Sequence, residues 1–507
     1  MKICFLLQRN FAYVGHAMAI ILKEKYNIKE FCGYVYARDS YNFLKKQKDI
    51  EYSSLLLDEE IHKYYKNEVI DFEFLKNLEK EYGMPNLWHY IIPDRVLMHN
   101  QHVREYPYNT PKYTHEEMLK ILQIKAKLII SFLERENPDC IVFSAIGGVG
   151  GILLHEIAKK KRIKILHIAQ ACMDNKLTLF NSYLQEDGMR SILEEYKEKK
   201  INKNTIQEAK KFLEKFRNTP KTYDSYSAPK FQQIDRLKQF QFLMPKKFLK
   251  SLYWLIRTAY ESFTSENRHD YTYIHAWGYT KDKLKRKLRN IIGIEDLYDK
   301  FDLKKPYAYF PLHMNPEIAT LLHAQFFQDQ IHVIKQIARS LPVGFKLYVK
   351  EHPRMVAFRP RKYYKELKKI PNVKIINPST SSFELIQNSK LVTTITGTSG
   401  WEAVMFKKPV ITFGDVFFNN LSFVKRCHSY ETLPFLIKNQ LENYKYDEDE
   451  LIKFISILFL ESVDVDFPQI WERESKFENK KIGIEPLVDL LAKNLIYRTS
   501  KKYSLIN

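Results

Sequence analysis

Cysteine is scarce in this chain, and long apolar runs are missing from it. Its 507 residues include five cysteines, which lie far apart with no paired spacing: Cys4, Cys32, Cys140, Cys172 and Cys427. This pattern fits a reducing compartment and argues against a zinc site. No apolar run reaches the ~20 residues that a bilayer-spanning helix needs, and the first residues indicate a short buried strand rather than a secretory signal. We therefore expect a cytoplasmic protein, one that could still bind peripherally to the inner face of the cell membrane.

The common phosphate-loop signatures are also missing. Four glycines, Gly147, Gly148, Gly150 and Gly151, stand between a predicted strand at 138–144 and a predicted helix at 152–161. No Gly-Lys-Ser/Thr follows them, which excludes a Walker loop. The spacing departs from the dinucleotide fingerprint, and no acidic residue is well placed to hold a ribose. Glycines at such a turn allow close approach by a ligand or by a neighbouring domain, so we expect a loop that lines a cleft.

Positive charge is abundant, with 81 Lys and Arg against 60 Asp and Glu and a formal net charge of +21. This balance favours an anionic partner: nucleic acid, acidic phospholipid, or a phosphorylated or carboxylated glycan. Residues 245–257 interleave lysines with Phe, Tyr, Trp and Leu, which suits an anionic membrane surface or a lipid-linked ligand. Residues 281–289 are basic too, and there a solvated helix face explains the pattern as well. No nucleic-acid-binding module is visible, so we expect no nucleic acid partner.

Length and apolar content allow two domains, since 507 residues exceed one ordinary domain and 45% are hydrophobic. No internal repeat supports a solenoid. Residues 40–110 are predicted to be mainly helical, and a long helix is predicted from Thr114 to Asn137 by an apolar stripe that includes Met118, Ile121 and Leu133.

The most informative stretch lies between residues 345 and 415. An apolar strand at 345–349 ends at Lys-Glu-His-Pro (350–353), because proline removes a ladder donor. A serine-rich segment at 379–386 begins a short helix. The strand at 391–395 leads into Thr-Gly-Thr-Ser-Gly (396–400) and a helix at 401–405, and a further strand at 409–413 ends in Gly-Asp.

This order places strand ends, two hydroxyl-rich turns and a helix N-terminus on one side of a parallel sheet, where ligands bind. Free amides and the positive end of a helix dipole suit a phosphate. Lys350 and His352 could add charge or donors there, and Glu402 could accept two hydroxyls of a ribose or sugar. The candidate binding residues are Lys350, His352, Thr396, Gly397, Thr398, Ser399 and Glu402. Taken singly, glycines such as Gly397 fit an ordinary tight turn equally well.

These motifs carry a resemblance. Lys-Glu-His-Pro at 350–353, Thr-Gly-Thr-Ser-Gly-Trp-Glu-Ala at 396–403 and Lys-Pro-Val at 408–410 look like the C-terminal half of the bacterial capsule polysaccharide biosynthesis family. Pro-Leu-His-Met-Asn-Pro-Glu at 311–317 is similar to the Gln-Pro-Glu motif of that family, with Asn315 in place of glutamine. Members of the family include glycosyltransferases that move Kdo from its CMP-activated form onto lipid-linked acceptors.

The resemblance implies an α/β, GT-B-like fold: two Rossmann-like domains face a cleft, with a helical insertion between them. The expected domains are an N-terminal acceptor domain at 1–175, a basic helical insertion at 176–305, a C-terminal nucleotide-sugar domain at 306–425, and C-terminal helices at 426–507. In this fold the last helices often cross back onto the first domain.

The function implied is sugar transfer from a nucleotide-sugar donor, most readily CMP-Kdo or a related ulosonic acid, to a polysaccharide or lipid-linked acceptor. No separate cofactor is expected. A metal is not required either, since the donor half lacks an Asp-x-Asp pair and Lys350 with His352 can take over the role of a cation. For the base that activates the acceptor, the candidates are His16, expected at a helix N-terminus in the cleft, and Glu317. A turn histidine with a local hydrogen bond explains His16 equally well.

Two alternatives remain open. One is transfer of a polyol phosphate from a CDP-activated donor, as in teichoic-acid polymerases, which typically show acidic residues before the second serine-rich turn. Here Thr-Ile-Thr at 394–396 occupies that place, which favours sugar transfer. The other is a non-catalytic subunit that holds a glycan for capsule assembly or export, although the intact His-Pro and Gly-Thr-Ser-Gly-x-Glu elements argue against it.

Overall fold

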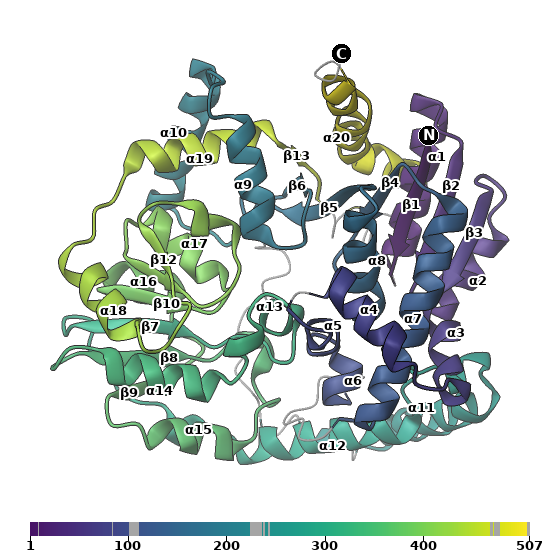
Figure 1. Cartoon of the computed structure of the whole chain (residues 1–507). Coiled ribbons are helices and arrows are strands. Elements are labelled where there is room, and N and C mark those ends of the chain that lie inside the picture. Colours follow the sequence, from purple (N-terminus) through teal and green to yellow (C-terminus); the bar gives the residue numbers. More distant parts are fainter. Residues whose placement is uncertain are drawn as a thin grey trace.

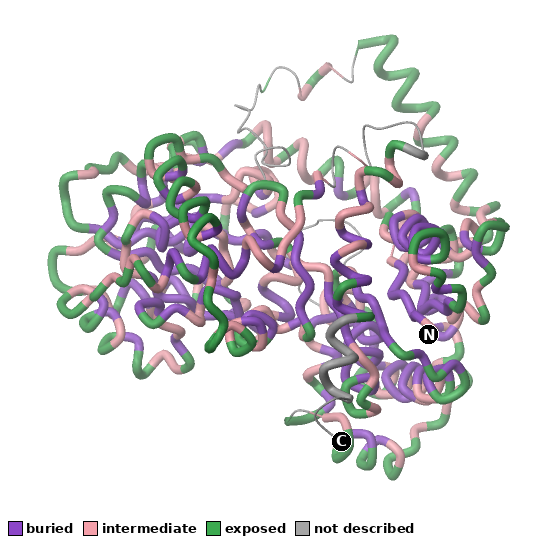
Figure 2. The backbone as a smooth tube through the Cα atoms, turned by 90° about the horizontal axis from the view of Figure 1, so that it is seen from above, coloured by how far each residue is buried: buried purple, intermediate pink, exposed green. Residues whose placement is uncertain are grey.

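Two β-sheets organise the chain in the computed structural model, one in each half of the molecule (Figure 1). The structure describes residues 1–503 except 9, 84, 101–110, 224–235, 237–238, 242–243, 467–469 and 471–476. In this described part of the chain, no helix has the length and apolar character needed to cross a membrane. Buried residues gather around the two sheets, and exposed residues lie mainly at the periphery (Figure 2).

The N-terminal domain has a seven-stranded sheet in the order β13-β6-β5-β4-β1-β2-β3. Five strands run parallel: β1 (Lys2–Leu7), β2 (Glu30–Val35), β3 (Tyr52–Leu57), β4 (Cys140–Phe143) and β5 (Lys164–Gln170). Two short strands extend the edge antiparallel: β6 (Lys176–Phe180) and β13 (Ser462–Asp464). The order 3-2-1-4-5 is that of a Rossmann half, whose ligand crevice lies at the carboxyl ends of β1 and β4, between which the strand order reverses.

Helices cover both faces of this sheet, which explains why β1 is apolar along its length. They are α1 (Phe11–Tyr26), α2 (Arg38–Lys46), α3 (Asp58–Lys63), α4 (Phe72–Tyr82), α5 (Trp88–Ile91), α6 (Arg95–His99), α7 (His115–Glu136) and α8 (Val149–Lys160). The predicted long helix is confirmed as α7. Thr114 and Glu117 form a capping box at its start, and Asn137 ends it in the left-handed conformation.

The C-terminal domain has a six-stranded, fully parallel sheet in the order β12-β11-β10-β7-β8-β9. Its strands are β7 (Tyr307–Pro311), β8 (Lys346–Lys350), β9 (Val373–Ile376), β10 (Leu391–Thr394), β11 (Val410–Thr412) and β12 (Val424–Arg426). Its helices are α13 (Ile318–Leu321), α14 (Gln330–Ser340), α15 (Arg361–Lys368), α16 (Ser382–Asn388), α17 (Thr398–Met405) and α18 (Leu433–Glu442). This is the full doubly wound order, with the crevice between β7 and β10.

The carboxyl edges of the two sheets face each other. Ile318 follows β7, and its Cδ1 lies 2.9 Å from the position that a Cβ on Gly147, after β4, would occupy. The glycine-rich loop therefore meets the neighbouring domain at Gly147. Two Rossmann-like domains that meet at their carboxyl edges form the GT-B-like arrangement expected from the sequence.

The domain boundaries differ from the sequence prediction in two places. β6 pairs with β5, so the N-terminal sheet continues beyond residue 175. Helices α9 (Gln185–Glu195) and α10 (Lys203–Asn218) pack with the C-terminal domain, since Met189 and Leu213 share a buried cluster with Trp401. The expectation that residues 40–110 are mainly helical misses β3, whose side chains are mostly half-buried at the edge of the sheet.

The last elements connect the domains. α19 (Glu448–Leu460) packs in the buried cluster of the C-terminal domain, and β13 then joins the N-terminal sheet. α20 (Phe477–Tyr503) lies against α1, where Lys25 pairs with Glu485 at 2.6 Å and with Asp489 at 2.8 Å. The chain thus crosses back onto its first domain.

A helical hairpin between the domains consists of α11 (Pro245–Thr264) and α12 (Ala276–Ile292). Figure 1 shows it along the lower edge, beneath both halves of the molecule. The segment after α11 is fixed to the N-terminal domain, because Tyr271 donates to buried Asp58 at 2.6 Å and Asp270 pairs with Arg38 at 3.0 Å. Both carboxylate oxygens of Asp58 also accept from Lys125 Nζ at 2.7 Å, inside the domain.

Candidate functional site

The candidate site lies at the carboxyl edge of the C-terminal sheet. His313 follows β7, Lys350 ends β8, and Thr394 ends β10. β7 lies between β8 and β10, so these three residues stand where the strand order reverses. In doubly wound sheets, ligands bind at this point.

Lys350 is a buried cation, with only 6% of its surface exposed. Its Nζ donates to Ser382 Oγ, in the first turn of α16, at 2.7 Å. Burial lowers the pKa of Lys350 to about 8, against the opposing effect of the Glu402 carboxylate. The serine-rich turn before α16 and the end of β8 therefore converge at this ammonium group.

Glu402 is equally buried, at 6% exposure, in α17. Burial raises its pKa to about 8, although the charge of Lys350 works in the other direction. Two ionisable groups of low exposure, Lys350 at the end of β8 and Glu402 in α17, thus lie near enough for each to shift the pKa of the other. Burying two ionisable groups in a protein interior costs free energy. Buried groups with shifted pKa values of this kind are common at functional sites.

His313 fixes the turn that begins α17. Its Nε2 accepts from the Thr396 amide at 3.1 Å and lies 3.2 Å from Thr394 Oγ1, which in turn accepts from the Gly397 amide at 2.9 Å. Burial lowers the pKa of His313 to about 3, and the charges of His352 and Arg359 add to this effect. The imidazole is therefore neutral, and its acceptor nitrogen sets the geometry of the Thr-Gly-Thr-Ser turn.

Amides remain available at this turn. The first amides of a helix have no intrahelical carbonyl to bind, and α17 begins at Thr398. Thr396, Gly397, Thr398 and Ser399 are all half-buried, in contrast to the buried residues on either side. The turn thus presents amides and hydroxyls at a partly open surface, as an anion site requires.

His352 begins the Pro353–Met355 turn, where its Nδ1 accepts from the Arg354 amide at 3.2 Å. The preceding residue, Glu351, is buried, pairs with the Arg359 guanidinium and accepts from Tyr364 at 2.6 Å. Arg359 also donates to the His313 carbonyl. This buried ion pair connects the His-Pro turn to the loop after β7, and so positions His352 relative to His313.

Glu317 lies beside this site, at the N-terminus of α13. The two residues after it contact the N-terminal domain and the α17 turn. Ile318 meets the glycine-rich loop of the N-terminal domain, and the Ala319 carbonyl accepts from Thr396 Oγ1 at 2.9 Å. Glu317 is thus half-buried at the junction of the two domains, next to the α17 turn.

His16 is not at a helix N-terminus, so that expectation is wrong. α1 begins at Phe11, and His16 lies more than one turn further along with 1% exposure. Its Nδ1 is 3.2 Å from the hydroxyl of Tyr52, at the amino end of β3, and its ring packs edge-on against Phe43. Burial lowers its pKa. The structure thus assigns His16 to the packing of the N-terminal domain.

Three residues of this arrangement were not singled out by sequence reasoning: Ser382, His313 and Arg359. His313 lies two residues after the end of β7, in the Pro-Leu-His-Met-Asn-Pro-Glu motif, so its position was a usable signal. Nothing in the sequence near Arg359 indicates that it pairs with Glu351 eight residues earlier, because that contact depends on how the intervening loop folds.

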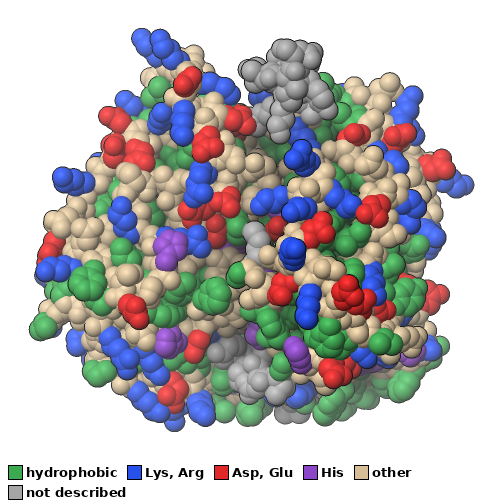
Figure 3. Space-filling model, viewed as in Figure 1, with side chains coloured by type: hydrophobic (Ala, Val, Ile, Leu, Met, Phe, Trp, Pro, Cys, Tyr) green, Lys and Arg blue, Asp and Glu red, His purple; other side chains and the backbone are tan. Residues whose placement is uncertain are grey.

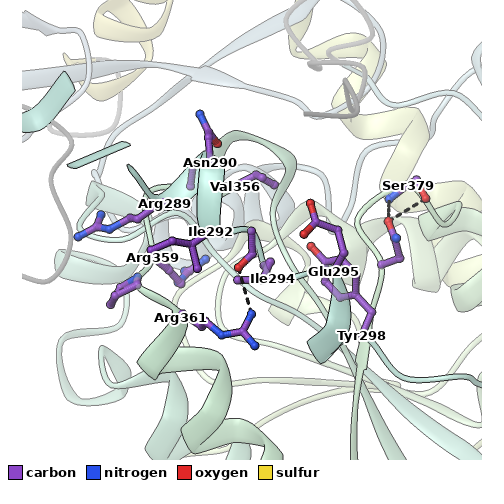
Figure 4. Close-up of a pocket in the computed structure, with 14 residues that line it drawn as sticks. Arg289, Asn290, Ile292, Ile294, Glu295, Tyr298, Val356, Arg359, Arg361 and Ser379 are labelled. Carbon is purple, nitrogen blue, oxygen red and sulfur yellow. Dashed lines mark hydrogen bonds between the residues drawn. The ribbon is translucent and has the colours of Figure 1, made fainter. Parts of the chain in front are cut away.

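A cavity of about 530 Å³ opens beside β9, where the end of α12 meets the 353–361 segment (Figure 4). It is lined by Arg289, Asn290, Ile292, Gly293, Ile294, Glu295, Tyr298, Val356, Ala357, Arg359, Pro360, Arg361, Asn377 and Ser379. Arg361 donates to the Gly293 carbonyl at 3.1 Å and pairs with Asp296, so its charge is already compensated. None of the sequence-predicted site residues lines this cavity.

Gly397→Ala is expected to lower the free energy of unfolding by about 1–3 kcal/mol, the usual cost of overpacking. An added Cβ would lie 2.7 Å from Thr394 Oγ1 and 3.0 Å from His313 Nε2, so the turn would have to move. Urea denaturation of the purified variant measures the effect.

The matched control is Gly278→Ala, near the start of α12, where the nearest atom to an added Cβ is Ile274 Cγ2 at an ordinary 3.5 Å. Alanine forms helix better than glycine, so this variant should be as stable as the parent or slightly more so. Equal stability of the two variants would contradict the crowding at Gly397.

Part of the chain is similar to a known protein family and to one curated protein. Residues 217–424 match the family model described as "Capsule polysaccharide biosynthesis protein". A curated relative, Protein FixF of Sinorhizobium fredii (strain NBRC 101917 / NGR234), is 30% identical over 132 residues, which cover 25% of this chain. The match spans 30% of that relative's length.

Two solved structures resemble this chain with low sequence identity and low TM-scores. One is the KpsC beta Kdo 2,7 transferase of Thermosulfurimonas dismutans, at 12% identity and a TM-score of 0.37, with 72% of this chain and 89% of that chain covered. The other is the UDP-GlcNAc 2-epimerase of Methanocaldococcus jannaschii, at 16% identity and a TM-score of 0.23, with 91% and 100% covered.

The family match covers the sheet edge that carries the candidate site, from the loop after β7 through the His-Pro turn to β11. The matched residues include Lys350, His352 and Glu402, so the part of this chain that carries the candidate site is similar to the capsule polysaccharide biosynthesis proteins.

Proposed function

We propose that the protein is a nucleotide-sugar-dependent glycosyltransferase of bacterial capsule or surface polysaccharide synthesis. The observation that carries this proposal is the buried Lys350 beside Ser382 and Glu402, next to the α17 turn. The donor we propose is a CMP-activated ulosonic acid such as Kdo. The acceptor is a polysaccharide or a lipid-linked glycan, used on the cytoplasmic side at an anionic membrane surface.

In this proposal the donor phosphate binds at the α17 turn. The amides and hydroxyls of Thr398 and Ser399, at the start of α17, donate to its oxygens, and Lys350 and His352 supply positive charge or further donors. Glu402, one turn into the helix, accepts from hydroxyls of the ribose. When the bond between the sugar and the phosphate oxygen breaks, negative charge grows on the nucleotide, so preformed donors there lower the barrier.

Glu317 is the proposed base. Its carboxylate would take the proton from the acceptor hydroxyl as that oxygen bonds to the anomeric carbon and the nucleotide leaves with its phosphate. Its position at the junction of the domains supports this role, because the acceptor must reach the donor from the N-terminal side. The buried His16, hydrogen-bonded to Tyr52, is not retained as the base.

Sugar transfer is favoured over polyol-phosphate transfer by the turn after β10. Thr394 and Thr396 both use their hydroxyls or amides in the turn itself, and no acidic side chain occupies this place. Glu402 is the nearby acid, and its raised pKa suits hydrogen bonding to a hydroxyl.

Thermal unfolding with added nucleotides tests the proposal. We expect CMP to raise the melting temperature, since a ligand at a hundred times its dissociation constant stabilises the folded state by roughly 2.7 kcal/mol. CDP, UDP and GDP, each with and without magnesium, serve as comparisons. His352→Ala should lose the CMP effect, and His332→Ala, on the surface of α14, should keep it.

The outcome also separates the alternatives. A shift with CDP alone would support polyol-phosphate transfer, and a shift with UDP or GDP would point to another sugar donor. Stabilisation by none of these nucleotides would contradict a transferase and favour a non-catalytic glycan-binding subunit.

A further inference from the structure

The α11–α12 hairpin carries an unusual amount of exposed apolar surface. Helix α11 has no buried residue along its whole length, and α12 has only Ala276 and Asp282. More of the exposed large hydrophobic side chains lie between residues 240 and 292 than on all the rest of the described chain. Soluble proteins rarely leave such a patch uncovered without a partner for it.

The apolar residues of α11 form one stripe. Spacings of three and four residues bring Tyr253, Ile256, Tyr260 and Phe263 to the same face of the helix, and they are 61–78% exposed. The opposite side of α11 packs on α12, because Lys283 lies 3.3 Å from the ring of Trp254 and Ser262 accepts from the Ala276 amide at 3.1 Å. The exposed stripe is therefore not the side by which the hairpin holds together.

Helix α12 adds Trp277, Leu284, Leu288 and Ile292, which are 53–72% exposed. Their spacings of seven, four and four residues bring them to one face of the helix. Lysines accompany both stripes: Lys246 and Lys250 on α11 and Lys281 on α12 are exposed. Residues 245–292 hold eleven Lys and Arg against four Asp and Glu. Figure 3 shows hydrophobic and basic side chains along the lower edge of the molecule, where Figure 1 places the hairpin.

The hairpin is fixed to both domains. Its α11 side is held to the N-terminal domain through Tyr271 and Asp270, as described above. The end of α12 is held to the C-terminal domain, because Arg289 donates to the Phe358 carbonyl and Arg361 to the Gly293 carbonyl. A surface bound by this hairpin would therefore be held in a set orientation to the whole molecule.

We propose that the exposed faces of α11 and α12 are the surface by which the protein binds an anionic phospholipid bilayer. Apolar and aromatic side chains on one face of a basic helix enter the interface between headgroups and acyl chains, and the surrounding lysines pair with anionic headgroups. The charge excess of this segment matches that partner, and a second copy of an equally basic hairpin would be repelled.

This surface would serve the anionic membrane of the proposed function, on which the choice of partner rests. It rests on the hairpin and not on the donor site, so its test measures binding to lipid without turnover. A protein that binds no nucleotide would refute the proposed transferase but would not affect lipid binding by the hairpin. A protein that binds no lipid would refute the hairpin surface but would not affect the donor site.

Vesicle sedimentation provides the test. The full-length protein is expected to pellet with vesicles of phosphatidylcholine that contain roughly one-third phosphatidylglycerol, and not with phosphatidylcholine alone. The combined variant Tyr253→Ser, Ile256→Ser, Tyr260→Ser should bind about tenfold more weakly. A matched control replaces three exposed hydrophobic residues elsewhere, Phe72→Ser, Val343→Ser and Phe435→Ser, which are 62%, 104% and 76% exposed, and it should bind like the parent.

Tryptophan fluorescence gives an independent reading. Trp277 is 72% exposed, so anionic vesicles should shift the emission of the protein to shorter wavelength, and Trp277→Phe should remove most of that shift. Absence of binding to anionic vesicles would overturn the proposal, as would equal binding by the triple variant and the control. A dimer in sedimentation velocity that the triple variant dissociates would show that a second copy covers this face instead.

Discussion

Lys350→Met is expected to lower kcat/KM for the nucleotide-sugar donor by about a hundredfold or more. Lys350 is buried at the carboxyl edge of the sheet, where its ammonium donates to Ser382 and interacts electrostatically with Glu402 in α17. Methionine keeps most of the side chain's volume and removes the charge. Loss of one preorganised donor at a centre of developing negative charge typically costs a factor of ~10²–10³. Steady-state kinetics with the donor varied measures this change.

The pH dependence of kcat/KM for the donor tests the role of the Lys350 charge in the parent protein. Burial lowers the pKa of Lys350 to about 8, so the free protein loses this positive charge as the pH rises through that value. We therefore expect kcat/KM for the donor to fall above pH 8. Glu402 titrates in the same range, and Lys350→Arg separates the two, because arginine stays charged and should carry the activity to higher pH.

Lys346→Met is the matched control. Lys346 begins the same strand, β8, at the opposite edge of the sheet, and its replacement should leave donor kinetics unchanged. A Lys350→Met variant with kinetics close to those of the parent would show that this ammonium group has a structural role only.

Glu402→Gln is expected to stabilise the fold and weaken nucleotide binding at the same time. Burial raises the pKa of Glu402 to about 8, although Lys350 opposes the shift. Between about pH 4.5 and 8 the folded protein keeps this proton while the unfolded chain releases it, so stability falls as the pH rises. Each pH unit costs about 1.4 kcal/mol. Glutamine removes the titration, and by pH 7 the variant should be roughly 3 kcal/mol more stable than the parent.

Urea unfolding of parent and variant at several pH values measures this difference, which should be small near pH 4.5 and should level off above pH 8. Glu384→Gln, at an exposed position at the start of α16, is the control and should follow the parent curve. Nucleotide binding should weaken in Glu402→Gln alone, since the amide offers one acceptor oxygen to the ribose hydroxyls, whereas the carboxylate that Glu402 forms on losing its proton offers two. A variant less stable than the parent at pH 7 would mean that Glu402 is ionised and favourably paired with Lys350.

The C-terminal half was predictable because its signals are local. The strands at 345–349 and 391–395 are apolar and β-branched, and each ends at residues that cannot continue it. β-branched runs between such chain-breaking residues favour a strand, and the strand, turn and helix expected around Gly397 are present as β10 and α17. The rule that ligands bind at the carboxyl edge of a parallel sheet then brings Lys350, His352 and the 396–399 turn together without knowledge of the fold.

The N-terminal half was less predictable, and β3 illustrates why. It is an edge strand whose side chains are mostly half-buried, so its sequence lacks the continuous apolar run of a central strand. β6 pairs with the preceding strand, β5, and β13 pairs with β6 from a distant part of the chain. Both strands are short, so their sequences show little alternation of apolar and polar residues. The boundary at residue 175 was therefore too early.

His16 shows what a motif cannot reveal. The residue follows a glycine after the first strand, as a cleft residue would, but the helix begins five residues earlier and turns the imidazole toward Tyr52. Which side of a helix faces a ligand depends on where the helix begins and what it packs against. Neither is encoded in the few residues around His16.

The sequence by itself determined the α/β class, the family resemblance and the residue types at the donor edge, because these depend on short stretches and on the period of apolar residues. Only the tertiary structure decided that Lys350 and Glu402 are both buried with pKa values near 8, that His313 fixes the α17 turn, and that the α11–α12 hairpin is bound to both domains with its apolar stripes exposed. Burial, pKa and exposure are sums over neighbours brought together from distant parts of the chain, and no local pattern of residues contains them.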